Sequence, residues 1–291
     1  MVRSLPRAAS AGSITLGDMR VARIGFGAMR TTGPGVWGEP RDRAEIRRLL
    51  RRVVELGVGL IDTADSYGPD VSEELIAEAL YPYPDNLIIA TKGGSLRPGP
   101  GQWVRDGRPE HLKRVCHESL RRLKLEQIPL YQLHAPAPNA SIEESVGALV
   151  DLQREGCIKH IGVSNVTEAE LDRALAIGPI VAVQNRYSLV DRRFDALVDR
   201  CTHDGIAFMP WAPLERGDVH APEVLAVAAR HDASVAQVML AWLLQHSPAL
   251  LPIPGTAALA HLEENVAAAA LCLSDADVAL LDSVAERTPD A

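Results

Sequence analysis

The sequence predicts an α/β protein whose fold is a (β/α)8 TIM barrel preceded by a short N-terminal β-hairpin. Two observations predict this fold: eight short apolar runs recur along the chain, and amphipathic helices separate many of them. Strands that are apolar throughout are typical of a parallel sheet covered on both faces. An open doubly wound sheet would give similar local patterns, but eight repeats favour a closed barrel. No linker rich in Pro, Gly or Ser divides the 291 residues, so we expect one domain over residues 1–291.

The expected elements follow one another in a regular order. A hairpin of residues 13–16 and 19–22 comes first, with a Gly-Asp turn between its strands. Glycine, the usual stop signal, closely follows three of the four expected helices, as Gly57, Gly156 and Gly178, and Thr167 is placed to cap the last helix. The expected helices are residues 41–56, 110–123, 142–155 and 168–176. The expected barrel strands are residues 24–27, 59–62, 87–91, 130–134, 160–163, 181–184, 206–210 and 250–253.

Charge and composition exclude several classes of protein. The net charge of -8 argues against a nucleic-acid partner, which needs a concentrated basic face. The arginine-rich stretch 41–52 is the exception, but Ile46, Leu49 and Val53 recur there at helical spacing. We therefore expect its arginines on the solvated face of an amphipathic helix.

The chain also lacks the patterns of membrane and secreted proteins. No apolar run reaches the length of a membrane span, and residues 1–11 lack the apolar core of a signal peptide. The four cysteines are far apart and form no C-x-x-C pair, which is typical of reduced thiols. We therefore expect a soluble, cytoplasmic protein with no membrane partner. No heptad or apolar stripe specifies an interface, so the oligomeric state stays open.

Four polar side chains stand at or just after the ends of three successive strands. These are Asp62 and Tyr67 after the second strand, Lys92 at the end of the third and His134 at the end of the fourth. Singly, Asp62 could cap a helix, Lys92 could pair with a surface acid, and His134 could lie in the core. Because the carboxyl ends of barrel strands meet at one mouth, we expect the four side chains to form one site.

The chemistry of carbonyl reduction gives this group a purpose. Hydride addition to a carbonyl leaves an alkoxide that needs a proton, and tyrosine, with an ordinary pKa near 10, is a poor donor and a worse base unless a cation favours its phenolate. Lys92 can supply that cation, Asp62 can hold Lys92 charged, and His134 can hydrogen-bond the substrate oxygen. Positioned proton transfer of this kind contributes about 10² to 10⁴ in rate.

The run Gly57-x-Gly59-x-x-Asp62-Thr63-Ala64-x-x-Tyr67-Gly68 strongly resembles the signature of the aldo-keto reductase family. The resemblance continues through Leu133-His134-x-Pro136, Gly162-Val163-Ser164-Asn165, Gln184-Asn185-x-Tyr187, Ile253-Pro254-Gly255-Thr256 and Leu262-Glu263-Glu264-Asn265, in the family's order. It implies an NADP(H)-dependent oxidoreductase that reduces aldehydes or ketones to alcohols. It also implies that Asp62, Tyr67, Lys92 and His134 are the catalytic tetrad, with Tyr67 as proton donor.

The resemblance further implies where the cofactor binds. Ser164, Asn165 and Gln184 match residues that hydrogen-bond the nicotinamide carboxamide, and Trp211 matches the aromatic side chain on which its ring stacks. Thr256 opens the last barrel helix, whose amides suit an anionic group. The expected cofactor-binding residues are Gly27, Met29, Asp62, Ser164, Asn165, Gln184, Trp211, Ala212, Leu214, Gly255, Thr256, His261, Glu264 and Asn265. Gly27 is expected to allow close approach of cofactor or substrate.

One departure from the family pattern concerns the choice of cofactor. Members that prefer NADP(H) usually carry Lys or Arg shortly after the Pro-Gly pair, against the 2′-phosphate. Here residues 257–260 are Ala-Ala-Leu-Ala, and His261 is the nearest potentially cationic side chain. We expect NADP(H), with a weakened preference and with NAD(H) as the alternative.

The substrate is expected to be a small carbonyl compound bound by variable loops at residues 30–40, 95–108 and 135–140. Trp37 and Trp103 are expected to wall the substrate pocket together with Tyr67 and His134. The loop 215–221 is short, so the pocket should be open. The stretches 29–38 and 81–85 resemble the bacterial branch that includes pyridoxal reductases, which makes pyridoxal or an aromatic aldehyde the first substrate to test.

Other functions fit the sequence less well. A glycosidase needs two carboxylates facing each other across the mouth, and a metal hydrolase needs convergent ligands, so no metal site is expected. The fragment Gly25-Phe26-Gly27 lacks the further glycine of a dinucleotide-binding fingerprint. The alternative from another class is a nicotinamide-binding regulatory or sensor subunit with little turnover. Such a subunit would tolerate loss of the tetrad, whereas all four residues are present here.

Overall fold

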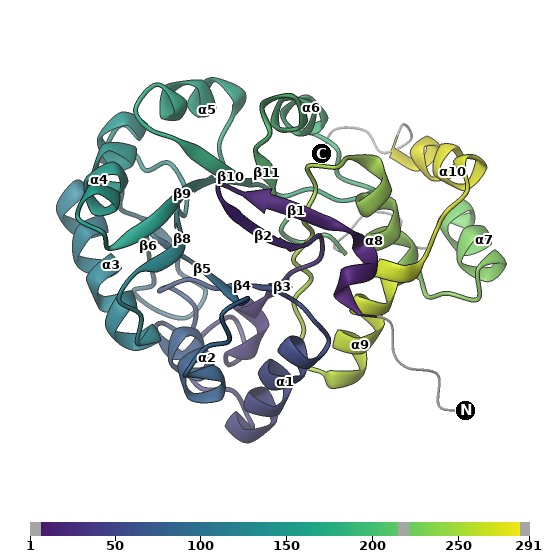
Figure 1. The fold of residues 1–291 in the computed structure, drawn as a ribbon, viewed down its shortest axis with the longest axis horizontal. Helices are drawn as coiled ribbons and strands as arrows, with labels where there is room; N and C mark the ends of the chain where they lie inside the picture. The colour runs from purple at the N-terminus through teal and green to yellow at the C-terminus, as the bar shows by residue number, and fades with distance from the viewer. Residues whose placement is uncertain (1–6, 215–220, 286–291) are drawn as a thin grey trace.

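A parallel sheet curled into a barrel forms the centre of the molecule, and helices surround it (Figure 1). This computed structural model describes residues 7–214 and 221–285. Seven strands pair side by side in the order β11-β10-β9-β8-β5-β4-β3, and every pairing is parallel. The strands are β3 (Phe26–Gly27), β4 (Leu60–Asp62), β5 (Ile88–Gly93), β8 (Ile128–Leu133), β9 (Ile158–Ser164), β10 (Ile180–Gln184) and β11 (Ala207–Phe208).

The eighth expected strand, residues 250–253, closes the barrel between β11 and β3. On one side the amide of Leu251 donates to the carbonyl of Phe208 (2.9 Å). On the other, the amide of Gly25 donates to the carbonyl of Pro252 (2.9 Å). Pro252 and Pro254 have no N–H group, so a regular ladder cannot form, and the segment joins the sheet through isolated bonds. The expectation of a (β/α)8 barrel is confirmed.

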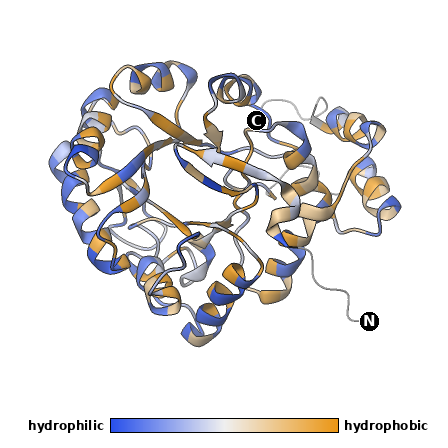
Figure 2. Cartoon of the chain, in the orientation of Figure 1, coloured by the Kyte–Doolittle hydropathy of each residue, from blue (hydrophilic) through white to orange (hydrophobic). Residues whose placement is uncertain are grey.

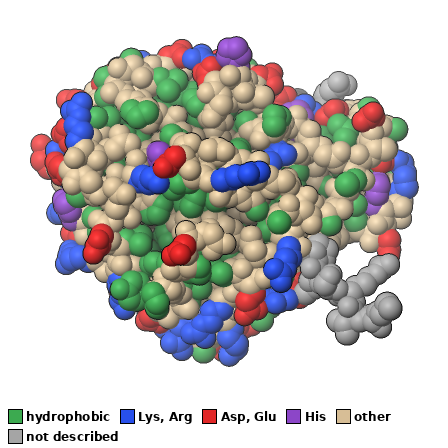
Figure 3. All heavy atoms as spheres, in the orientation of Figure 1, with side chains coloured by type: hydrophobic (Ala, Val, Ile, Leu, Met, Phe, Trp, Pro, Cys, Tyr) green, Lys and Arg blue, Asp and Glu red, His purple; other side chains and the backbone are tan. Residues whose placement is uncertain are grey.

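The expected hairpin lies across the N-terminal opening of the barrel (Figure 1). Leu16 and Val21 are buried and belong to the same apolar cluster as the interior side chains of the barrel. In the turn, the carboxylate of Asp18 lies 2.6 Å from Nε2 of His160 and 2.9 Å from Nζ of Lys159. Figure 3 shows this face covered by side chains and backbone. The site must therefore open at the opposite end. The hairpin strands are β1 (Ser13–Leu16) and β2 (Met19–Ala22).

The helices pack with apolar sides toward the barrel and polar sides outward (Figure 2). The four expected helices are present: α1 is two residues shorter at its start and one at its end, α4 and α5 each end one residue early, and α3 begins one residue early. The arginines of the first pair with acids on the surface; Arg43, for example, lies 2.6 Å from both Glu39 and Glu78. The helices are α1 (Arg43–Glu55), α2 (Val71–Leu80), α3 (Pro109–Leu123), α4 (Ile142–Arg154), α5 (Glu168–Leu175), α6 (Asp195–Asp204), α7 (Pro222–Arg230), α8 (Val235–His246), α9 (Leu259–Ala267) and α10 (Asp275–Ala285), with 3-10 turns η1 (Ala8–Ala11), η2 (Ala28–Thr31) and η3 (Ala268–Ala270).

The long loop after β5 contains a two-stranded antiparallel hairpin that was not expected from the sequence, β6 (Ser95–Leu96) with β7 (Val104–Arg105). Within the described ranges, no single helix is long and apolar enough to cross a membrane. Taken together, α7 and α8 are long and apolar enough, but the chain bends by 92° between them.

Candidate active site

A cavity of about 500 Å³ opens at the carboxyl ends of the barrel strands. Asp62 at the end of β4, Tyr67 in the loop that follows and His134 after β8 line it. Lys92 of β5 lies beneath this surface and is fully buried. The four residues that the sequence predicts to act together are therefore brought together at one mouth.

The ammonium of Lys92 is at the centre of this group. Its Nζ donates to Oδ2 of Asp62 (2.7 Å), to the carbonyl of Thr63 (2.9 Å) and to Oη of Tyr67 (3.3 Å). Burial alone would lower the pKa of Lys92, but the charges and hydrogen bonds of Asp62 and Tyr67 outweigh it, so the pKa is raised. Lys92 is therefore held as a cation against the tyrosine hydroxyl.

The carboxylate of Asp62 is held at both oxygens. Oδ2 accepts from Lys92, while Oδ1 accepts from Nε2 of Gln132 (3.1 Å) and Nε2 of Gln184 (2.8 Å). Gln132 was not identified from the sequence, because one glutamine in an apolar strand belongs to none of the motifs. The two glutamines thus supply hydrogen bonds that a buried carboxylate would otherwise lose to water.

The hydroxyl of Tyr67 is buried, with 6% of the residue exposed. Burial raises the pKa of Tyr67, and the nearby Lys92 cation opposes that rise. The phenol is therefore protonated at neutral pH and touches a cation that can receive part of the charge when the proton leaves.

The imidazole of His134 lies beside Tyr67 at the cavity wall, edge-on to its ring. Its ring centroid lies 5.9 Å from that of Tyr67, with the rings at 84°. Nδ1 lies 3.4 Å from Oγ of Ser66, which was not identified from the sequence. Burial, together with the Lys92 and Arg105 charges, holds the pKa of His134 well below its usual range. The ring is therefore neutral, and Nε2 is left for a ligand in the cavity.

The ends of β9, β10 and β11 form the second wall of the cavity. Asn165 joins its parts: Nδ2 donates to the carbonyl of His134 (3.0 Å), and Oδ1 accepts from Nε1 of Trp211 (3.1 Å). Asn165 and Ala212 have φ angles of 58° and 53°, a conformation that is uncommon for residues other than glycine. Such conformations cluster at functional sites, where the surrounding structure enforces them. Trp211 is thus held in a fixed orientation at the wall.

Most of the expected cofactor-binding residues line this cavity. Gly27, Met29, Asp62, Ser164, Asn165, Gln184, Trp211, Ala212, Leu214 and Gly255 are all at its surface. The remaining four are at the head of α9 or on it, outside the described cavity wall: Thr256, His261, Glu264 and Asn265. Of these, His261 is exposed and Asn265 is buried.

Gly27 and Gly255 are glycines because two backbones meet between them. A Cβ on Gly27 would lie 2.7 Å from the carbonyl of Ile253, and one on Gly255 would lie 2.6 Å from the carbonyl of Gly27. Gly27 was expected to allow close approach of cofactor or substrate, and it does lie at the cavity surface. Its lack of a side chain also allows barrel closure, since the closing segment could not approach β3 past a Cβ.

On the substrate side the two tryptophans are placed differently. Trp103 lines the cavity, and its ring centroid lies 6.2 Å from that of His134. Trp37, which was expected to line the pocket, is not among the described lining residues; it lies behind Arg97, 5.6 Å from its Cζ. Arg30, Ser95 and Arg105 also line the cavity and were not identified from the sequence. The expectation of an open pocket rested on the loop 215–221, of which residues 215–220 lie outside the described residues.

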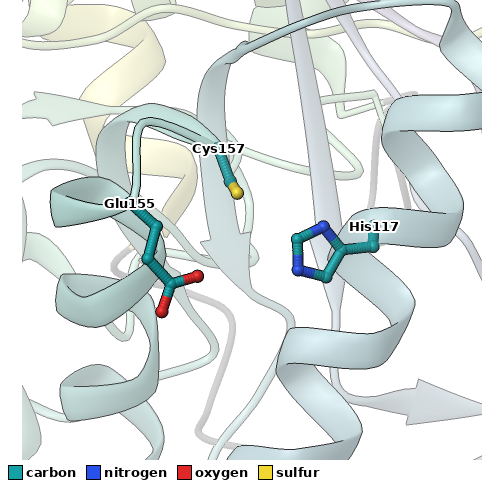
Figure 4. A group of neighbouring side chains, drawn as sticks. All are labelled: His117, Glu155 and Cys157. Atoms are coloured by element: carbon teal, nitrogen blue, oxygen red, sulfur yellow. The ribbon is translucent and has the colours of Figure 1, made fainter.

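A separate group of potential ligands lies at the opposite end of the barrel. His117 of α3 projects toward Glu155 after α4 and Cys157 before β9, with ligand atoms within 4.8 Å of one another (Figure 4). Burial and the nearby Glu155 raise the pKa of Cys157, which disfavours the thiolate that a metal would bind. Glu155 also has Lys113 at 3.7 Å. We assign no function to this group.

Comparison with known proteins places this geometry in context. The model of the Aldo/keto reductase family matches residues 23–286. The chain is 46% identical over 277 residues to an uncharacterised oxidoreductase of Schizosaccharomyces pombe, covering 94% of this chain and 90% of that protein. It is 44% identical over 286 residues to pyridoxine 4-dehydrogenase of Escherichia coli, covering 96% of this chain and 100% of that enzyme. A solved aldo-keto reductase from Klebsiella pneumoniae in complex with NADPH superimposes with a TM-score of 0.79 at 25% identity, covering 97% of this chain and 95% of that one.

Proposed function

Because this chain belongs to the aldo/keto reductase family, we propose that it transfers hydride between NADP(H) and an aldehyde or ketone, with Tyr67 as the proton donor. The observation that carries the proposal is the contact of Tyr67 Oη with a buried ammonium, itself held by Asp62. Burying a lysine costs desolvation energy, and here the charge of Asp62 and the carbonyl of Thr63 offset that cost.

The second wall of the cavity has the chemistry that a nicotinamide requires. Trp211 offers an aromatic face, and Ser164 and Gln184 place polar atoms beside it. The solved relative from Klebsiella pneumoniae was obtained in complex with NADPH, which supports the same cofactor here. NADP(H), when bound, supplies the hydride. The chain's own residues orient the ring and exclude water from the reacting carbon.

The proton follows a short path in the proposed reaction. Tyr67 Oη donates its proton to the substrate oxygen as the carbonyl carbon is reduced, and the phenolate that remains lies 3.3 Å from Nζ of Lys92. His134 directs the substrate oxygen toward Tyr67: when Ser66 donates to Nδ1, the ring proton resides on Nε2 and points to the cavity. The oxygen then lies between two donors.

We propose a planar aldehyde of the pyridoxal type as substrate. The relative that is 44% identical is named pyridoxine 4-dehydrogenase, an activity that interconverts the alcohol and aldehyde of such a ring. The wall formed by Trp103 supports the same class, because an indole offers a flat apolar face to an aromatic ring.

The test is the loss of absorbance at 340 nm with NADPH and a panel of aldehydes that includes pyridoxal and 4-nitrobenzaldehyde. Tyr67→Phe should retain NADPH binding and lose about 10²- to 10⁴-fold in kcat, since only the proton donor is removed. Tyr83→Phe is the matched control, because its hydroxyl bonds the carbonyl of Leu123 and lies outside the cavity wall. Full activity of Tyr67→Phe would refute the assignment of the acid. Tight NADPH binding with no turnover in the wild type would favour a regulatory subunit.

A further inference from the structure

Arg97 is a buried arginine that joins three of the loops around the cavity. Its Nε donates to the carbonyl of Gln102 (3.0 Å), in the loop after β5. Nη1 donates to the carbonyl of Val36 (2.9 Å) and Nη2 to that of Gly35 (3.0 Å), both in the loop after β3. Nη1 also reaches the carbonyl of Ser66 at 3.4 Å, next to the proposed proton donor. The planar guanidinium thus fixes three loops relative to one another.

The same guanidinium lies against an indole at the cavity wall. Its Cζ is 3.8 Å from the ring centroid of Trp103 and 5.6 Å from that of Trp37. Trp103 is 44% exposed, and it lines the cavity within 6.2 Å of His134. Because Arg97 covers one face of the Trp103 ring, the exposed surface of the ring is on its other face and edges.

An exposed tryptophan on a long loop would ordinarily sample several rotamers, and a substrate would have to select one of them. Cation–π contact and four carbonyl partners restrict both Arg97 and the ring above it. Within residues 7–214 and 221–285, no carboxylate pairs with Arg97. Its partners are carbonyl oxygens and indole faces, so its directional bonds all serve the loops.

We propose that Arg97 is a positioning residue that holds the indole of Trp103 flat beside the substrate site and so gives selectivity for planar aromatic aldehydes. The proposal rests on the reductase function above and names its substrate class. A planar ring can stack on the held indole, whereas a puckered saturated ring of the same size cannot.

The experiment compares benzaldehyde with cyclohexanecarbaldehyde, which differ in planarity at nearly equal size. Arg97→Met should lower the ratio of their kcat/KM values about tenfold, through a higher KM for benzaldehyde. The NADPH Kd and the kcat for cyclohexanecarbaldehyde should stay within about threefold. Arg108→Met is the matched control, since Arg108 is exposed, pairs with Asp106 and lies outside the cavity wall. Tryptophan emission should also shift in Arg97→Met, and this shift should be absent when Trp103 is replaced by Phe.

A double-mutant cycle separates positioning from general damage to the fold. In a Trp103→Ala background, Arg97→Met should have no further effect on the aldehyde ratio. The proposal is overturned if the ratio is unchanged in Arg97→Met, or if it falls equally in both backgrounds. If Arg97→Met does not fold, Trp103→Ala alone decides: a retained ratio overturns the proposal. A wild type that reduces neither aldehyde would overturn both the reductase function and this inference, whereas a wild type that reduces both at a ratio indifferent to Arg97 overturns this inference alone.

Discussion

The side chains of Lys92 and Asp62 form an ion pair that is 1% and 3% exposed. A pair so buried costs desolvation energy, and removing one partner alone typically costs about 3–5 kcal/mol because the other charge stays buried. The structure offsets this cost with the carbonyl of Thr63 and the amides of Gln132 and Gln184. The ion pair is therefore weak evidence for stability and stronger evidence for a role in proton transfer.

The pH dependence of carbonyl reduction follows from two shifted groups. Burial raises the pKa of Tyr67, so the donor stays protonated well into the alkaline range; burial lowers the pKa of His134 well below its usual value, so the imidazole stays neutral. We expect kcat for reduction to be flat through the neutral and mildly alkaline range and to fall only above the pH range in which an ordinary tyrosine ionises, because the pKa of the donor is raised. Initial rates at saturating NADPH and aldehyde measure this. A midpoint near pH 7 would contradict the neutral state of His134.

Trp211 gives a second prediction for a single side chain. Trp211→Ala should weaken NADPH binding about tenfold or more and leave the melting temperature nearly unchanged, because the ring is only partly buried and lies at the cavity wall. Fluorescence titration with NADPH measures the Kd, and Trp103→Ala serves as the control on the opposite wall. Unchanged affinity would show that another residue forms the platform for the nicotinamide.

Some residues of the site could be predicted from the sequence and others could not. Asp62, Lys92 and His134 belong to motifs at strand ends, where the order of the chain fixes the mouth they face. Gln132 and Ser66 hydrogen-bond to Asp62 and His134, which are far from them in the sequence. Only the folded geometry therefore identifies these two residues. The role of Arg97 could not be predicted either, because the sequence of its glycine- and proline-rich loop does not specify a conformation from which its contacts could be inferred.

The elements differ in how well their pattern specifies them. The helices with capping residues were located closely; α5, for example, begins after Thr167, whose Oγ accepts from the amide of Glu170. Residues 250–253 have an apolar pattern, but Pro252 and the adjacent Pro254 have no N–H group, so the segment forms no regular ladder and is held by single hydrogen bonds to its neighbours. The β6–β7 hairpin has polar and glycine-rich flanks, and no alternation marked it.

The N-terminal hairpin gives a prediction for an element. Leu16 is fully buried at the bottom of the barrel, so Leu16→Ala should reduce the free energy of unfolding by about 2–4 kcal/mol. The NADPH Kd should not change, because the hairpin closes the end opposite to the cavity. Leu225→Ala is the matched control, since Leu225 is 45% exposed on α7, and it should cost less than about 1 kcal/mol. Urea unfolding of both variants measures this; equal losses would show that the hairpin is not part of the core.

At the scale of the whole molecule, the two ends of the barrel differ: one is closed by packing and the other carries the cavity. The hairpin and the interior side chains close one end with apolar packing, and the loops of the other end carry the polar groups. The expectation that one domain spans residues 1–291 stays a prediction, because the structure describes neither terminus. In such a barrel the loop sequences can change, and with them the substrate that is bound, while the strands keep the proposed tetrad in place.

The preference for NADPH over NADH can be measured as the stabilisation of the whole molecule by each cofactor. A ligand present at 100 times its Kd raises the free energy of unfolding by about 2.7 kcal/mol, so thermal shifts report the two affinities directly. The stretch 257–260 carries no cation, and His261 is exposed. We therefore expect NADPH to give a larger shift than NADH at low salt, and the difference to shrink near 1 M salt, where the Debye length is about 3 Å. His261→Arg should widen the gap at low salt. A large NADPH preference that survives high salt in the wild type would show that buried groups, such as Thr256 at the head of α9, hold the 2′-phosphate instead.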